Sequence, residues 1–132
     1  MPNKHLIIAG IMSLLCCAVA QMGDAKPKAK GGGGNHMQRG IELAKQNHFD
    51  AAAEEFGKAI KDNPNDPRGY ANRGTAYRQG ARAAMAAGDQ PGASTRYQSA
   101  MADFSKAIEL APKDGSLYQE RGETEIELKQ YD

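Results

Sequence analysis

Apolar residues recur at helical spacing over most of the chain, from about residue 35 onward. The clearest example is the stretch FDAAAEEFGKAIKDNP, Phe49 to Pro64, in which Ala52, Phe56, Ala59 and Ile60 follow one another at steps of four, three and one. This spacing puts the apolar side chains on one face of a helix and leaves charged residues on the opposite face. The pattern therefore predicts an amphipathic helix here.

The same stretch returns further along the chain as YQSAMADFSKAIELAP, from Tyr97 to Pro112, with every matching position at the same offset. A second pattern precedes each copy and occurs again near the end: HMQRGIEL begins at His36, YANRGTAY at Tyr70 and YQERGETE at Tyr118. A repeating unit of about 34 residues, made of helix, turn and helix, is typical of a solenoid whose repeats stack on one another. The interval from His36 to Tyr70 fits this unit, and the interval from Tyr70 to Tyr118 is longer.

At these residues the sequence resembles the tetratricopeptide repeat (TPR) family, over about residues 33–132. The shared features are an aromatic residue, Gly and Tyr in the first helix, Ala, Phe and Ala in the second helix, and Pro at its close. The resemblance implies an all-α fold, a right-handed solenoid of antiparallel helical hairpins with two complete repeats and a partial third. The repeats are expected at about residues 33–66, 67–114 and 115–132.

We expect helices at about residues 35–46, 50–61, 67–87, 91–111 and 114–129. Asp50, Asp66 and Asp114 are candidate N-caps because a short acidic side chain can accept a hydrogen bond from the first helical turn. In TPRs a small residue at the position of Gly40 lets the two helices approach while Phe56 fills the neighbouring layer. The second repeat exceeds the usual length of the unit, and we predict that both of its helices are extended into one long, Ala-rich hairpin whose tip is less stable than its base.

Residues 1–20 read as a secretory signal peptide, with Lys4 and His5 before an apolar run that ends in Ala18-Val19-Ala20. The run from Leu6 to Ala20 is shorter than the ~20 residues that span a membrane, so no stable membrane anchor is expected after cleavage. Residues 21–34, rich in Lys and Gly, read as a flexible linker, and residues 35–132 as the TPR domain. We expect a secreted protein of the bacterial periplasm.

The third repeat contains only the pattern of a first helix, which leaves two interpretations open. Glu125, at the position of Leu43 and Tyr77, favours a solvated helix that caps the solenoid. Ile126 and Tyr131, together with Leu128, would be left partly exposed, and they favour a longer array of which this chain is a part.

The composition argues against several classes of function. The net charge of +1 and the absence of a basic cluster argue against nucleic acid as a partner. His36 and His48 are isolated, and both cysteines lie within residues 1–20, so no metal site, cofactor or catalytic group is expected, and the protein is predicted not to be an enzyme.

The resemblance implies instead a concave groove, lined by the first helix of each repeat, in which a peptide or protein segment binds. The protein would then be a non-catalytic adaptor or scaffold. The alternative is an assembly subunit that forms a homo-oligomer, or joins a larger complex, through the solenoid ends or the long hairpin. The groove residues would be Met37, Ile41, Ala44, Lys45, Arg68, Ala71, Thr75, Arg78, Gln79, Arg82, Gln119, Glu123 and Glu127.

The residues expected in this groove bear on which ligand it could bind. Some TPRs hold a C-terminal carboxylate with Lys, Asn and Arg, but Met37 and Ile41 stand where Lys and Asn would be needed, so no such clamp is expected. Arg78 and Arg82, and likewise Glu123 and Glu127, are four residues apart on one helix face. They form either a basic and an acidic wall that select a peptide of mixed charge, or ion pairs with each other across neighbouring helices.

Overall fold

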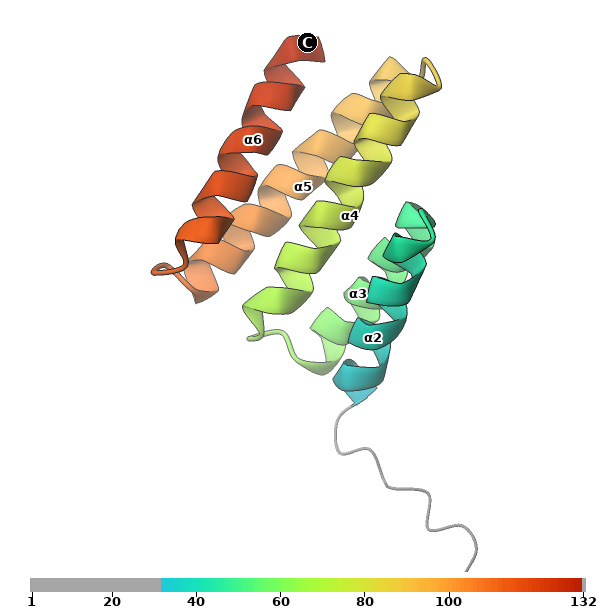
Figure 1. Ribbon diagram of the computed structural model, residues 1–132. Coiled ribbons are helices and arrows are strands. Elements are labelled where there is room, and N and C mark those ends of the chain that lie inside the picture. The colour runs from blue at the N-terminus through green and yellow to red at the C-terminus, as the bar shows by residue number, and fades with distance from the viewer. Residues whose placement is uncertain (1–31, 132) are drawn as a thin grey trace, which may run out of the picture. The chain divides into compact units, whose positions relative to one another are not determined.

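The computed structural model describes residues 32–131, which form helices joined by short turns, with no strand in this range (Figure 1). The expectation of an all-α fold is confirmed for this part of the chain. The predicted signal peptide lies outside the described residues. The helices are α2 (Gly32–Lys45), α3 (Phe49–Asp62), α4 (Pro67–Ala86), α5 (Gln90–Leu110) and α6 (Gly115–Tyr131).

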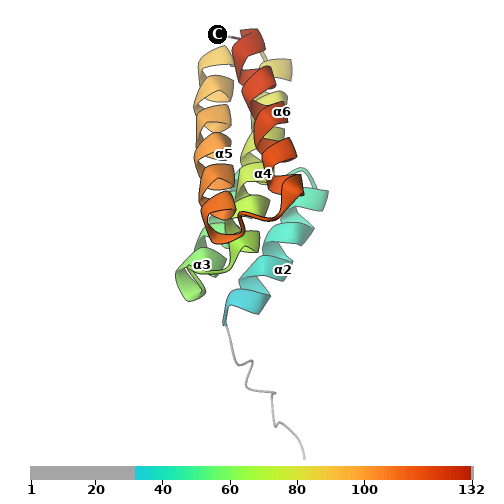
Figure 2. The same cartoon turned by 90° about the vertical axis from the view of Figure 1, so that its left-hand side faces the viewer.

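The helices pair in the order of the chain, α2 with α3 and α4 with α5, and α6 packs mainly against α5. Figure 2 shows α3 and α5 on one side of this array and α2 and α6 on the other. First helices and second helices therefore lie in separate layers, as stacked hairpins require. None of the helices in residues 32–131 is both long and apolar enough to cross a membrane.

Two of the three predicted N-caps are confirmed. The Asp66 carboxylate accepts a hydrogen bond from the backbone N–H of Arg68 at 3.0 Å, with Pro67 at the first helical position of α4. The Asp114 carboxylate accepts the backbone N–H of Ser116 at 3.0 Å at the start of α6. Each satisfies a donor that has no partner within its own helix.

The prediction for Asp50 is wrong. Helix α3 begins at Phe49, so Asp50 lies inside its first turn and His48 precedes the helix without a side-chain cap. The N–H of His48 bonds to the carbonyl of Leu43 at 2.9 Å, which closes the turn after α2 and starts α3 one residue earlier than expected. The carboxylate of Asp50 is instead bound by Arg96 of α5.

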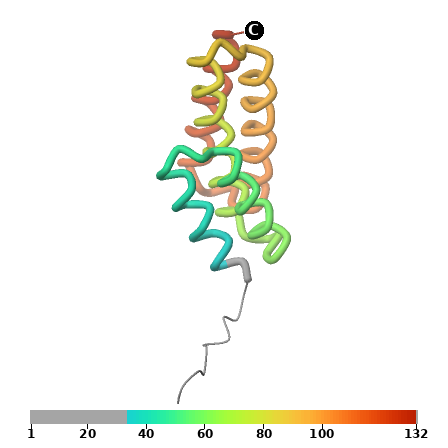
Figure 3. The backbone as a smooth tube through the Cα atoms, turned by 90° about the vertical axis from the view of Figure 1, so that its right-hand side faces the viewer, coloured from blue at the N-terminus to red at the C-terminus, as the bar shows by residue number. Residues whose placement is uncertain are grey.

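The second hairpin is longer than the first, as predicted. Helices α4 and α5 have 20 and 21 residues, whereas α2 and α3 have 14 each. Gly88, with a φ of 81°, makes the turn at the tip, and the Asp89 carboxylate then caps α5 by accepting the N–H of Gly92 at 3.0 Å. In Figure 3 the second hairpin continues beyond the turn that joins α2 to α3.

One close contact recurs in both hairpins. A methyl group at Gly40 would lie 2.5 Å from the ring of Phe56, and one at Gly74 would lie 3.1 Å from the ring of Phe104. The two rings are buried, with 2% and 0% of their surface exposed. The expectation that Gly40 admits the large ring of Phe56 is confirmed, and Gly74 and Phe104 repeat the contact. The equivalent Gly122 of α6 has no such neighbour within 4 Å.

This contact predicts opposite effects for the same substitution. Alanine at Gly40 overpacks a buried contact, at a cost of about 1–3 kcal/mol that exceeds the gain of ~1 kcal/mol in helix propensity. Alanine at Gly122 meets open space, so this substitution should gain helix propensity without a steric cost. In urea denaturation, Gly40→Ala should lower the midpoint and Gly122→Ala should raise it; two shifts of the same sign would contradict the packing described here.

Candidate functional site

A pocket of about 310 Å³ opens between α2 and α4, the first helices of the two complete repeats. We call it the α2/α4 groove. Five residues that the sequence predicted for the groove line it together: Ile41, Ala44 and Lys45 of α2, and Thr75 and Gln79 of α4. The complete lining is Ile41, Ala44, Lys45, Phe56, Asn72, Thr75 and Gln79.

The groove combines an apolar base with polar groups suited to a peptide. Ile41 and the buried ring of Phe56 provide apolar surface, while the side chains of Asn72 and Gln79 carry amide donors and acceptors that match a peptide backbone. Among the residues that the structure describes, the Asn72 amide donates only to the sulfur of Met37, a weak acceptor, at 3.1 Å. Lys45 is the one charged residue in this lining.

Three other predicted groove residues are occupied elsewhere. Met37 packs against the core cluster that contains Phe56. Arg68 forms an ion pair with Asp66 at 2.7 Å at the N-terminal end of α4. Gln119 donates a hydrogen bond to Glu123 at 2.9 Å within α6.

Ala71 packs against the core cluster between α5 and α6, and the remaining four predicted groove residues link α4 to α6. Arg78 donates to Glu123 at 2.8 Å and also to Glu120, and Arg82 donates to Glu127 at 2.8 Å. We call these five residues the α4–α6 ladder. The pairing interpretation is confirmed and the two-wall interpretation is wrong, because the carboxylates that would form the acidic wall are neutralised by the arginines opposite them.

The pKa shifts agree with a ladder that is closed at neutral pH. A hydrogen bond from Gln119 and the contact with Arg78 lower the pKa of Glu123, and the contact with Arg82 lowers that of Glu127. Burial, and then its hydrogen bond to Glu127 at 3.1 Å, raise the pKa of Tyr97 to about 12. At neutral pH, Glu123 and Glu127 therefore stay ionised and Tyr97 stays neutral, as the hydrogen bonds require.

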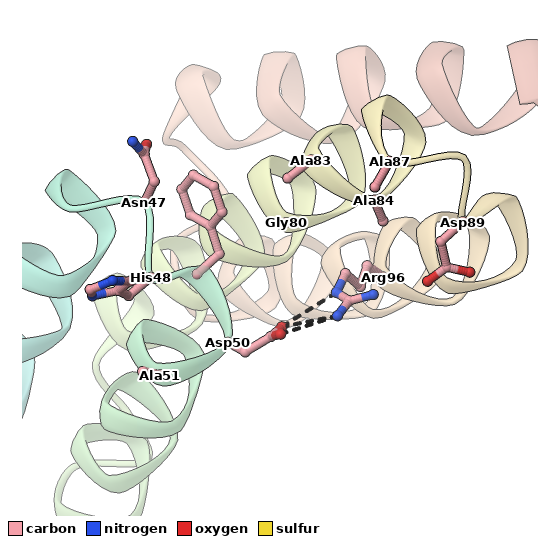
Figure 4. Close-up of a pocket in the computed structure, with 11 residues that line it drawn as sticks. Asn47, His48, Asp50, Ala51, Gly80, Ala83, Ala84, Ala87, Asp89 and Arg96 are labelled. Carbon is pink, nitrogen blue, oxygen red and sulfur yellow. Dashed lines mark hydrogen bonds and ion pairs between the residues drawn. The ribbon is translucent and has the colours of Figure 1, made fainter.

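The sequence did not reveal a second cleft, of about 510 Å³, between the turn after α2 and the outer part of the long hairpin (Figure 4). His48 and Phe49 line one side, Gly80 and Ala84 of α4 the other, and Arg96 binds Asp50 at 3.1 Å beside it. The cleft exists because the first hairpin ends before the second. The difference in length between the repeats was the available signal, but it gave no position for the cleft.

The structure also places His36 and His48. His36 binds the Glu55 carboxylate through Nδ1 at 2.7 Å, and His48 lies in the turn after α2. Within residues 32–131, no group of three or more His, Cys, Asp or Glu side chains is arranged to hold a metal ion.

Comparison with known proteins identifies the repeat. Residues 40–80, which include all of α3 and most of α4, match the family described as TPR repeat. The fold is a TPR-type solenoid. Hsp70-Hsp90 organizing protein 2 of Arabidopsis thaliana is 30% identical over 100 residues, or 76% of this chain and 15% of that protein. Hsp70-Hsp90 organizing protein 3 of the same plant is 30% identical over 95 residues, 72% of this chain and 14% of that protein.

The α4–α6 ladder predicts how α6 is held. Arg78→Leu leaves Glu120 and Glu123 as neighbouring anions without their cation, so the backbone amides of α6 should exchange hydrogen faster while those of α2 and α3 do not change. Lys106→Leu, which removes an exposed pair within α5, is the control and should leave α6 unchanged. Equal rates of amide hydrogen exchange in α6 of the two variants would show that the α4–α6 ladder does not stabilise this helix.

The contact of His36 with Glu55 predicts a dependence of stability on pH. Hydrogen bonds from His36 and then Lys58 lower the pKa of Glu55 from 4.5 to about 2. Because the folded pKa is the lower one, this contribution is complete above pH 4.5 and is lost as the pH falls toward 2. As the pH falls through this window, the urea midpoint of unfolding should fall less steeply in Glu55→Gln than in the unmodified chain. Equal slopes in the two proteins would contradict the lowered pKa of Glu55.

Proposed function

We propose that this protein is a non-catalytic interaction module that binds a peptide segment of a partner protein in the α2/α4 groove. The observation that supports this most is the open pocket itself, in which Ile41, Lys45, Thr75 and Gln79 meet at the position that the TPR resemblance implies for a ligand. On the other half of the concave face, the arginines of the α4–α6 ladder are already engaged.

The lining also suggests the chemistry of the ligand. An apolar side chain would contact Ile41 and Phe56, the peptide backbone would bond to the amides of Asn72 and Gln79, and a carboxylate would pair with Lys45. A segment with an apolar residue next to an acidic one meets all three requirements. No ion pair within residues 32–131 competes for Lys45.

The relatives support a role in bringing proteins together, because both are named for organizing Hsp70 and Hsp90. This chain spans only about one seventh of their length. Met37 and Ile41 are apolar where a carboxylate clamp needs Lys and Asn, and Met37 packs against the core. Our proposal therefore includes a peptide ligand but not the two chaperones of the relatives' names. The bacterial envelope as its setting is likewise a proposal, which depends on residues 1–20.

A peptide display selection on the immobilised full chain would test the groove. Selected peptides should carry an acidic residue beside an apolar one, and Lys45→Glu should weaken their binding by about tenfold or more, equivalent to ~1.4 kcal/mol. Lys61→Glu is a matched control, because Lys61 lies in the last turn of α3 as Lys45 does in the last turn of α2. Equal losses in the two variants, or peptides that shift NMR signals of α3 and not of α2 and α4, would contradict the proposal.

A further inference from the structure

The difference in length between the two hairpins leaves a cleft of about 510 Å³ beyond the end of the first hairpin. We call it the shoulder cleft. A volume of this size is within the range of ~300–1,000 Å³ that ligand pockets occupy. The lining comes from the turn after α2, the first turn of α3, the outer part of α4 and the first two turns of α5, none of which is at an end of the described chain. The lining residues are Asn47, His48, Phe49, Asp50, Ala51, Gly80, Ala83, Ala84, Ala87, Asp89 and Arg96.

The floor of the shoulder cleft is apolar and consists of small residues. Gly80 lies at its base, where an added methyl group would stand 3.4 Å from both Phe49 and Arg96. Ala83 and Ala84 continue the floor along the outer part of α4. Because these side chains are short, the space above them stays open where a longer first hairpin would have packed. The floor therefore suits the methylene groups of a long side chain.

The rim of the shoulder cleft carries more negative than positive charge. Arg96 donates to Asp50 at 3.1 Å and to the carbonyl of Gly92 at 3.3 Å. In Figure 4, Asp50 and Asp89 lie on either side of Arg96, and the contact with Asp50, together with the charge of Asp89, raises the pKa of Arg96. The Asp50 side chain is 74% exposed, and Asp89 forms no ion pair within residues 32–131. Two carboxylates therefore share one guanidinium, and this rim can accept a second cation.

The shoulder cleft continues the α2/α4 groove along both of its walls. On α4, Gln79 lines the groove and Ala83 lines the cleft, and four helical residues span ~6 Å. On the opposite wall, Lys45 lines the groove and Asn47 lines the cleft two residues later. An extended peptide whose carboxylate pairs with Lys45 therefore reaches Ala83 and then Ala87 within about two to four residues, at ~3.3 Å per residue.

We propose that the shoulder cleft binds a Lys or Arg side chain from the same peptide segment whose acidic residue pairs with Lys45. The methylene groups of this side chain pack on Phe49 and Ala84, and its cationic head binds the carboxylates of Asp50 and Asp89. The ligand then has two parts, an apolar residue next to an acidic one and a basic residue about two to four positions away. This inference rests on the proposed function, because the ligand of the groove continues into the cleft.

A selection of random displayed peptides on the immobilised full chain should enrich Lys or Arg at a fixed distance on one side of the acidic residue. Asp50→Asn combined with Asp89→Asn should abolish this enrichment, while the pair of acidic and apolar residues persists. Asn caps a helix about as well as Asp, so α5 keeps its N-terminal cap in this variant. Glu54→Gln combined with Asp62→Asn is the matched control, because it removes the same charge from α3 outside the cleft and should leave the enrichment unchanged.

A second measurement compares two versions of one selected peptide, one with its basic residue and one with Gln in that place. By fluorescence anisotropy on the full chain, the basic version should bind about three- to fivefold more tightly, as expected for one exposed ion pair. Ala83→Arg puts a like charge into the cleft and should abolish this ratio, whereas Ala86→Arg, in the same turn of α4 but outside the cleft, should preserve it. Because both peptides are measured on the same variant, a change in stability cancels from the ratio.

The cleft can also be tested without the groove, using the small probe acetyl-Leu-Arg-amide. In NMR titrations it should shift the backbone amide signals of Gly80 and Ala84, both in the unmodified chain and in Lys45→Glu. Asp50→Asn combined with Asp89→Asn should remove these shifts.

The outcomes separate this inference from the proposed function. Selected peptides that lack the acidic residue contradict both. Peptides that carry the acidic and apolar residues but no basic residue at a fixed distance overturn only the two-part ligand. Equal ratios in Ala83→Arg and Ala86→Arg, or no shift of Gly80 and Ala84 with the small probe, would also overturn it.

Discussion

The structure depends on how closely two helix backbones approach at a glycine beneath a phenylalanine ring. At Gly40 the ring of Phe56 occupies space that any Cβ would need, and Gly74 and Phe104 repeat the arrangement in a longer hairpin. Because interiors are close-packed, this approach sets the spacing within each hairpin. The hairpins then stack into two layers, and the first helices α2, α4 and α6 together form one face of the stack.

Charged side chains determine which parts of that face stay open. Between α4 and α6, Arg78 and Arg82 bind three carboxylates, and Arg78 is almost completely buried with only 6% of its surface exposed. Between α2 and α4 no such pairs exist among the lining residues, and the face there remains a pocket with a single lysine. Ion pairs therefore close one half of this surface, and the other half keeps an open pocket.

Periodicity was sufficient to predict the helices and the long second hairpin, because each is set by spacing along a single helix or by the pairing of adjacent helices. The resemblance to TPRs supplied the prediction for Gly40 and Phe56. The same resemblance implied that Ile41 and Gln79 lie on the groove, and both line the pocket. Periodicity could not show that Glu120 would join Glu123 at Arg78, or that Arg96 would reach Asp50. Those contacts depend on the rotation between successive hairpins, which is set by side-chain packing between hairpins and leaves no period in the sequence.

Within residues 32–131, a glycine packs beneath a phenylalanine ring at Gly40 and at Gly74, whereas Gly122 has no such ring over it. NMR spectroscopy of the folded chain tests this difference directly. We expect nuclear Overhauser effects between the Hα protons of Gly40 and the ring of Phe56, and between those of Gly74 and the ring of Phe104. Both glycines should show ring-current shifts, while the Hα protons of Gly122 should show neither effect. A missing contact at Gly40 or Gly74, or an aromatic contact at Gly122 in the chain alone, would contradict the account.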